Sequence, residues 1–180
     1  MIAIIGLGNP GEEYADTRHN AGFKAIDILA DRLHANYWKD ECGALVAHCD
    51  DILLVKPQAF MNLSGGPVKN ITEKYEIDDL IVVHDDIDIA SGNVRVKRGG
   101  GNAGHNGLKS IDNKLGSKDY IRVRVGIDSP PGRMPLVDYV LGVPKDDDFV
   151  SACIRAADAV EYLFNHSVEE AQNKFNQSVQ

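Results

Sequence analysis

Long apolar runs are absent from this 180-residue chain, and cysteine is scarce. No run approaches the ~20 apolar residues that a bilayer span needs. Residues 1–8 are apolar, but they lack a basic leader and run directly into a glycine turn, so no signal peptide is expected. The three cysteines, Cys42, Cys49 and Cys153, are odd in number and fit no metal-ligand spacing. They predict reduced thiols in a cytoplasmic protein.

Basic residues are also in short supply, with 19 against 27 acidic ones and a net charge of −8. An acidic chain argues against a protein that wraps nucleic acid. Residues 95–133 are the exception, because nine basic and three acidic side chains give +6 there and leave −14 elsewhere. This segment predicts a basic face that touches a partner at a few phosphates, or else an unevenly charged solvated surface. The basic members are Arg95, Lys97, Arg98, Lys109, Lys114, Lys118, Arg122, Arg124 and Arg133.

Apolar residues make up 43% of the chain, enough for one packed core, and the length indicates a single domain. Short apolar or alternating runs predict strands at 1–5, 44–48, 52–56, 80–84, 94–97 and 120–127. A 3.6-residue apolar period predicts helices at 21–34, 67–75, 107–115, 149–164 and 168–175. Strands that alternate with helices are typical of an α/β domain.

Three turns rich in glycine and asparagine stand out. The segment 99–107, GGGNAGHNG, holds five glycines in nine residues. Such a run serves where the backbone needs a positive φ or must lie close to something bulky, although alone it equally fits a flexible loop. The segments 6–11, GLGNPG, and 60–65, FMNLSG, are of the same kind. Their asparagines suit carbonyl and hydroxyl partners.

The glycines at 6, 8 and 11 match the spacing of a dinucleotide-binding fingerprint after a strand. In that motif the helix begins inside the glycine turn. Here Pro10 interrupts, residues 12–20 are polar, and no second strand ending in an acidic residue comes before residue 44. The spacing therefore does not predict nicotinamide binding.

His19 lies in a polar stretch between a predicted strand and the helix at 21–34. There an imidazole can reach solvent and act as a general base, or it can cap the helix. No Gly-x-Ser-x-Gly elbow is present, and no cysteine has activating neighbours in the sequence. A water activated by His19 is therefore favoured over a covalent nucleophile.

An acidic motif, HDDID, follows the strand at 80–84, at the strand end where α/β sites collect. It has three interpretations: a divalent metal site, an acidic turn, or a carboxylate on Asp85 that orients His19. The last is preferred, because a metal site would leave His19 and the asparagines of the turns unexplained. Further candidate substrate contacts are three amides and three apolar side chains, whose alternative is turn or core packing: Asn9, Asn62, Asn106, Tyr14, Phe60 and Met61.

Together the three turns and the HDD motif, in this order, resemble the bacterial-type peptidyl-tRNA hydrolase family over residues 1–141 and more weakly to the C-terminus. The resemblance implies one α/β domain over residues 1–180, a twisted mixed β-sheet flanked by helices on both sides. It implies an esterase that cleaves the bond between a peptide, or N-blocked aminoacyl group, and the terminal ribose of tRNA. Prematurely released peptidyl-tRNA would be recycled by a cytoplasmic monomer with no cofactor, no metal, no membrane and no obligatory protein partner.

The resemblance also assigns roles. His19 would be the base, Asp85 its stabiliser, and Asn9 would contact the substrate near the ester and help to select N-blocked groups. The binding site would be formed by Tyr14, Phe60, Met61, Asn62, His105 and Asn106, while the tRNA 5′-phosphate beside the acceptor end would be held by Lys97 and Arg124. The chain departs from the family pattern at Asn102 and Ala103, where the family often has another residue and a glycine. The Ala103 methyl group could therefore alter the backbone path.

Two other functions stay open from the sequence. One is a metal-dependent hydrolase built on His84, Asp85, Asp86 and Asp88. The other is a non-catalytic RNA-binding module that uses residues 95–133. Cleavage of an N-blocked aminoacyl-tRNA with and without chelator would separate all three.

Overall fold

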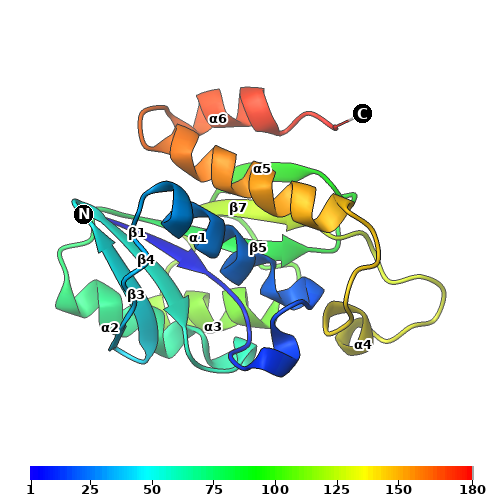
Figure 1. Cartoon of the computed structure of the whole chain (residues 1–180), viewed down its shortest axis with the longest axis horizontal. Coiled ribbons are helices and arrows are strands. Elements are labelled where there is room, and N and C mark those ends of the chain that lie inside the picture. The colour runs from blue at the N-terminus through cyan, green and yellow to red at the C-terminus, as the bar shows by residue number, and fades with distance from the viewer. Residues whose placement is uncertain (180) are drawn as a thin grey trace.

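One twisted sheet of seven strands, in the order β2-β3-β4-β1-β5-β7-β6, organises the computed structural model, which describes residues 1–179 (Figure 1). Parallel pairs join β1 to β4 and β5, and β5 to β7, whereas β2–β3, β3–β4 and β6–β7 are antiparallel. The mixed sheet expected from the resemblance is confirmed. The strands are β1 (Ile2–Gly6), β2 (Lys39–Glu41), β3 (Ala44–Cys49), β4 (Ile52–Pro57), β5 (Asp79–Asp86), β6 (Val94–Arg98) and β7 (Ile121–Gly126).

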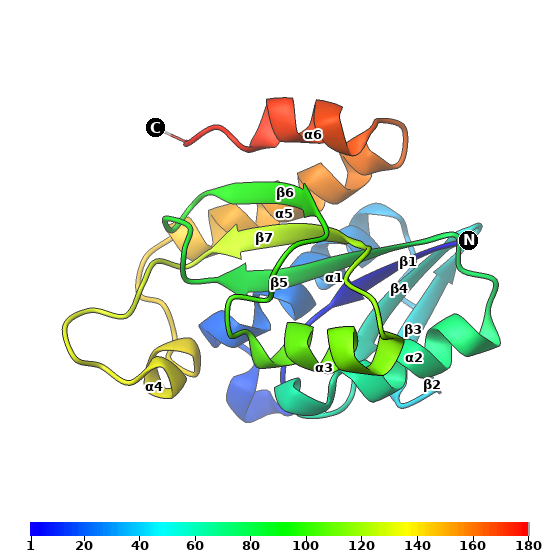
Figure 2. The same cartoon turned by 180° about the vertical axis from the view of Figure 1, so that it is seen from behind.

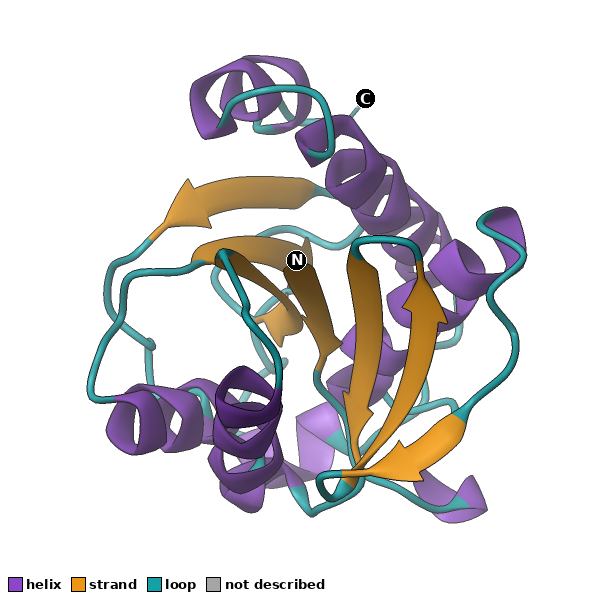
Figure 3. Cartoon of the chain, turned by 90° about the vertical axis from the view of Figure 1, so that its left-hand side faces the viewer, coloured by secondary structure: helices purple, strands orange, loops and turns teal. Residues whose placement is uncertain are grey.

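Helices cover both faces of the sheet, as the view along its edge shows (Figure 3). One face packs against α1 (Ala21–Arg32), α5 (Asp148–Leu163) and α6 (Val168–Phe175), and the other against α2 (Gly65–Lys74) and α3 (Asn106–Leu115). Successive strand residues point to opposite faces. Val83 therefore joins the α1 side of the core and Val82 the α2–α3 side. By the same alternation, Asp85 belongs to the α1 side and His84 to the other.

All the predicted helices and strands are present, and no end is shifted by more than two residues. The sequence did not reveal β2, a charged edge strand of three residues, or α4 (Leu136–Val140), a five-residue helix after Pro135 at one end of the molecule (Figure 2). It also did not reveal three single 3₁₀ turns, η1 (Glu12–Tyr14), η2 (Arg18–Asn20) and η3 (Met61–Leu63). Such short elements carry no measurable period. Within residues 1–179 no helix is long and apolar enough to cross a membrane.

Two of the glycines in the dinucleotide-like spacing, Gly6 and Gly8, serve packing against α1 instead. A Cβ on Gly22 would lie 2.3 Å from Leu7 N and from Val83 O, so α1 touches the backbone of the sheet. A Cβ on Gly6 would lie 2.4 Å from Gly22 O. A side chain at either position would push the helix away. This contact fixes η2, and with it His19, beside the carboxyl ends of β1 and β5.

Candidate active site

A cavity of about 320 Å³ opens at the carboxyl ends of β1 and β5. Its walls come from the loop after β1, η2, η3, the end of β5, the glycine-rich segment 99–107 and α4. Most of the predicted site residues line it, namely Asn9, His19, Phe60, Met61, Asn62, Asp85, His105 and Asn106. Tyr14, Lys97 and Arg124 lie outside this lining.

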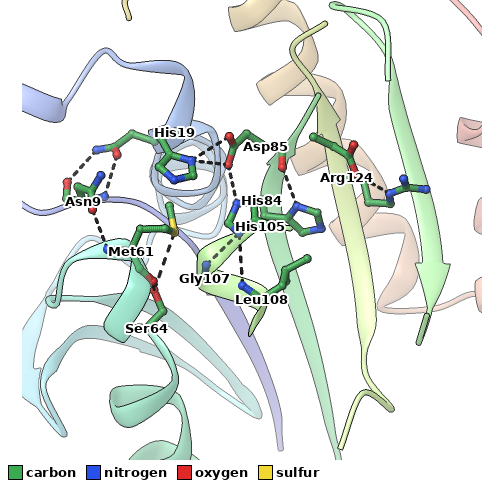
Figure 4. A network of polar contacts seen from close by, with 12 residues as sticks. Asn9, His19, Met61, Ser64, His84, Asp85, His105, Gly107, Leu108 and Arg124 are labelled. Atoms are coloured by element: carbon green, nitrogen blue, oxygen red, sulfur yellow. Dashed lines mark hydrogen bonds and ion pairs between the residues drawn. The ribbon is translucent and has the colours of Figure 1, made fainter. Parts of the chain in front are cut away.

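His19 and Asp85, 66 residues apart in the sequence, form the centre of the site (Figure 4). The His19 Nδ1 atom lies 2.9 Å from Asp85 Oδ2 and 3.0 Å from Oδ1. An ionised carboxylate only accepts hydrogen bonds, so Nδ1 carries the proton and donates. The Nε2 lone pair of His19 is thereby left for another partner at the cavity wall.

Asp85 accepts a second hydrogen bond, because His105 Nε2 lies 2.8 Å from Oδ1. The carboxylate side chain is only 2% exposed. Burial raises its pKa, but the electrostatic attraction of the two imidazole rings and their N–H hydrogen bonds outweigh burial and bring the pKa well below the ordinary range. Asp85 therefore stays ionised throughout the neutral pH range.

His105 also holds the start of α3. Its Nδ1 accepts hydrogen bonds from the backbone N–H groups of Gly107, at 3.1 Å, and Leu108, at 3.3 Å. With Nε2 on Asp85, both ring nitrogens are engaged. His105 lines the cavity, as predicted for a substrate contact, but it offers a ligand only the carbon edge of its ring.

Asn9 is held by two neighbours on separate turns. Its backbone exchanges two hydrogen bonds with the side chain of buried Asn20, and its Oδ1 accepts from the Met61 N–H at 2.7 Å. The Asn9 Nδ2 amide makes no protein hydrogen bond within residues 1–179, and it therefore remains a free donor at the cavity wall. Asn20, next to His19, is a site residue that the sequence did not single out.

One wall of the cavity is apolar. Four residues from α4 and its C-cap contribute to it, and the sequence analysis missed them: Leu136, Val137, Val140 and Leu141. Phe60 is 57% exposed and adds a further apolar surface, with the Tyr14 ring packed edge-on against it at 6.4 Å between ring centroids. Met61 is buried in the core and also lines the cavity. Asn62 and Asn106 are exposed at its rim.

The residues of the alternative metal site do not converge. His84 Nδ1 donates to the backbone oxygen of Asp85, and burial, followed by the adjacent His105 ring, lowers the His84 pKa to about 4. Asp86 accepts from Arg124 and from the Asp88 backbone, and the Asp88 side chain is exposed. Within the described residues, the metal-capable groups that do meet are His19, Asp85 and His105. In these three residues, His19 Nδ1 and His105 Nε2 are instead hydrogen-bonded to the Asp85 carboxylate.

Comparison with known proteins agrees with the function that this geometry indicates. The sequence model of the family described as "Peptidyl-tRNA hydrolase" matches residues 3–180. The chain belongs to the peptidyl-tRNA hydrolase family.

Several relatives extend over nearly the whole chain. A peptidyl-tRNA hydrolase of Frankia alni is 47% identical across 96% of this chain and 92% of its own length. One from Kineococcus radiotolerans is 43% identical, with 96% of each chain covered. The crystal structure of peptidyl-tRNA hydrolase from Acinetobacter baumannii superposes with a TM-score of 0.89 at 33% identity, covering 97% of this chain and 93% of that one. The fold predicted from the motifs is thus confirmed.

The departure from the peptidyl-tRNA hydrolase pattern at Ala103 lies in a turn with a positive φ. Ala103 adopts φ 50°, in the left-handed region that a glycine would occupy without strain. An L-residue there costs roughly 1 kcal/mol. Asn102 supports the same turn through a hydrogen bond from the Gly104 N–H to its Oδ1 at 3.0 Å. The methyl group lines the cavity and does not block it.

The basic face is smaller than the sequence predicted. Arg122 is 2% exposed; it donates to Gly101 O and lies 3.7 Å from Asp112, so it supports the glycine-rich segment from below. Lys97 on β6 lies directly opposite Arg122 in the strand register with β7, and Arg124 lies two residues further along β7. Lys97 and Arg124 therefore project from the same face of this ribbon as diagonal neighbours.

Proposed function

We propose that this chain hydrolyses the ester between a peptide, or an N-blocked aminoacyl group, and the terminal ribose of tRNA. One observation carries the proposal: a paired His19 and Asp85 face a cavity whose rim consists of asparagine turns, in a chain of the peptidyl-tRNA hydrolase family. We further propose that a single domain over residues 1–180 performs this reaction as a cytoplasmic monomer.

In the proposed reaction His19 acts as a general base. Its Nε2 takes a proton from a water, and the water oxygen attacks the ester carbonyl carbon. The tetrahedral intermediate then expels the ribose oxygen, which receives the proton back from the imidazolium. Asp85 holds the Nδ1–H tautomer and stabilises the imidazolium that forms in between.

Asn9 is the proposed donor to the substrate. Because Met61 already occupies Oδ1, the amide can present only its Nδ2 hydrogens, which suit the carbonyl oxygen of the ester or of the N-blocking group. The apolar surfaces of Phe60 and α4 suit an adenine ring or a peptide side chain.

Changing Asn9 to Asp is expected to lower activity and to narrow the preference for N-blocked over free aminoacyl-tRNA. The carboxylate can still accept from Met61, but it removes the donor and attracts the cationic free amino group. The ratio of kcat/KM for N-acetyl-aminoacyl-tRNA and aminoacyl-tRNA measures this effect. The same change at Asn36, on the exposed loop after α1, is the control. An unaltered ratio would show that Asn9 does not select N-blocked over free aminoacyl-tRNA.

Lys97 and Arg124 are proposed to hold the tRNA 5′-phosphate beside the acceptor end. Lys97 is exposed and lies over the glycine-rich segment, where a Cβ on Gly100 would come within 2.6 Å of its Nζ. Arg124 donates through Nε to Asp86 at 2.8 Å, which orients the guanidinium and leaves its other nitrogens for a phosphate.

Changing Lys97 to Ala is expected to raise KM for full-length substrate with little change in kcat, because the contact lies away from the ester. The slope of log KM against log salt should flatten by roughly one unit. Substrate without the 5′-phosphate should bind the wild type and the variant alike. Lys39→Ala, at the opposite edge of the sheet, is the control. If removal of the phosphate weakened both proteins equally, the phosphate contact would be elsewhere.

The proposed function is tested by incubating the protein with N-acetyl-aminoacyl-tRNA and identifying both products. Release of intact N-acetyl amino acid and full-length tRNA is expected. Binding without release would favour the RNA-binding module, and shortened RNA would indicate a nuclease.

A further inference from the structure

His105 occupies an unusual place for a histidine, the N-cap of α3. Serine, threonine, aspartate and asparagine are the common N-caps, because their side-chain oxygens accept from the first free N–H groups. Here Nδ1 does so, for Gly107 and Leu108. The ring lies close to the backbone of Gly107, where an added Cβ would come 3.0 Å from His105 Cε1.

This contact fixes the protonation of the ring. A nitrogen that accepts from two N–H groups carries no proton, so the proton of His105 resides on Nε2. That N–H lies 2.8 Å from Asp85 Oδ1 and donates to it. Protonation of the other nitrogen would set an N–H against the N–H groups of α3, so the helix opposes the cationic form of the ring.

Two imidazoles therefore share one carboxylate, and they share it unequally. His19 keeps a free Nε2 that can take up a proton, whereas His105 has Nε2 on Asp85 and Nδ1 on the N–H groups of α3. We propose that His105 is a positioning residue: α3 holds it as the Nε2–H tautomer, and it fixes Asp85 and weakens the pull of that carboxylate on the proton of His19. This inference rests on the proposed roles of His19 and Asp85.

The surroundings leave His105 as the group suited to this task. Apart from His19 and His105, the titratable groups near the carboxylate are His84, Asp86 and Cys153 on α5. His84 faces the backbone oxygen of Asp85, and Asp86 is paired with Arg124. Burial raises the pKa of the Cys153 thiol to about 12 and keeps it neutral.

Two substitutions separate the two bonds of His105. In His105→Asn, the side-chain oxygen takes the place of Nδ1 and can cap α3, but nothing reaches Asp85. In His105→Gln, the longer amide can donate to Asp85 from the place of Nε2, but the cap is lost. Each variant removes one of these two contacts and keeps the other. The effect of the helix cap on stability can therefore be measured separately from the effect of the Asp85 hydrogen bond on catalysis.

His105→Asn is expected to melt near the wild-type temperature, while the acid limb of its pH–rate profile moves to higher pH by about half a unit or more. The direction follows because Asp85, with one donor fewer, holds the His19 proton more strongly. His105→Gln is expected to melt several degrees below the wild type, while the acid limb of its pH–rate profile stays at the wild-type pH. If neither variant moved the limb, or both moved it equally, His105 would be a helix cap only and the proposal would fail.

NMR of the ring nitrogens tests the same inference without substrate. At neutral pH His105 should show a proton on Nε2 and none on Nδ1, and the titration midpoint of His19 should rise in His105→Asn. A proton on Nδ1 of His105, or an unmoved His19 midpoint, would overturn the proposal. The predicted NMR result in a protein that hydrolyses nothing would sustain this inference and refute the proposed function alone.

Discussion

Replacing His19 by alanine is expected to remove nearly all ester hydrolysis and to leave the fold intact. A positioned general base contributes ~10²–10⁴ in rate. Within the described structure no other imidazole at the cavity offers an accessible free nitrogen, because both His105 nitrogens are engaged and the unpartnered Nε2 of His84 is buried. The turnover of N-acetyl-aminoacyl-tRNA under saturating conditions is the measurement, with circular dichroism to verify folding.

His19→Asn is the matched variant. Its amide nitrogen can replace Nδ1 as the donor to Asp85, so the buried carboxylate keeps both hydrogen bonds. It lacks a lone pair in the place of Nε2 and should be as inactive as the alanine variant. If either folded variant retained turnover within tenfold of the wild type, His19 would not be the base.

Changing Asp85 to Asn is expected to lower turnover on the order of 10²–10⁴ and to affect KM much less. Two N–H groups, from His19 and His105, point at this side chain. An amide offers them one oxygen and one NH₂ group, so one donor loses its acceptor or one ring must change its tautomer. The negative charge that stabilises the imidazolium is lost as well.

The sign of the pH effect follows from that charge. Without it, His19 loses its proton more readily, so the acid limb of kcat/KM should move to lower pH, opposite to the shift expected for His105→Asn. The pH–rate profiles of wild type and variant measure this directly. A limb and rate that stayed in place would show that Asp85 does not partner His19.

The His19–Asp85 pair was predictable because each residue follows a strand of recognisable pattern. The strands at 1–5 and 80–84 are apolar and short, and strand ends of an α/β sheet collect at one edge. The pair then forms because β1 and β5 are parallel neighbours. The prediction that the helix after the glycine spacing at 6–11 begins only near residue 21 is confirmed, because α1 begins at Ala21.

Other features depend on contacts that no local pattern encodes. Asparagine is a common helix cap, yet the Asn20 side chain makes two hydrogen bonds to the backbone of Asn9 on the loop after β1. Arg122 alternates with Arg124 in sequence as though exposed, but the glycine-rich segment and Asp112 bury it. The two bonds of His105 join α3 to β5 over 20 residues. Tertiary packing determines all three.

The most direct test of the central claim is hydrolysis of an N-acetyl-aminoacyl minihelix, folded in monovalent salt, by protein treated with chelator. If a water activated by His19 performs the reaction, chelator should leave the rate unchanged and His19→Asn should abolish it. A rate that collapsed with chelator and returned on addition of a divalent metal would contradict this account.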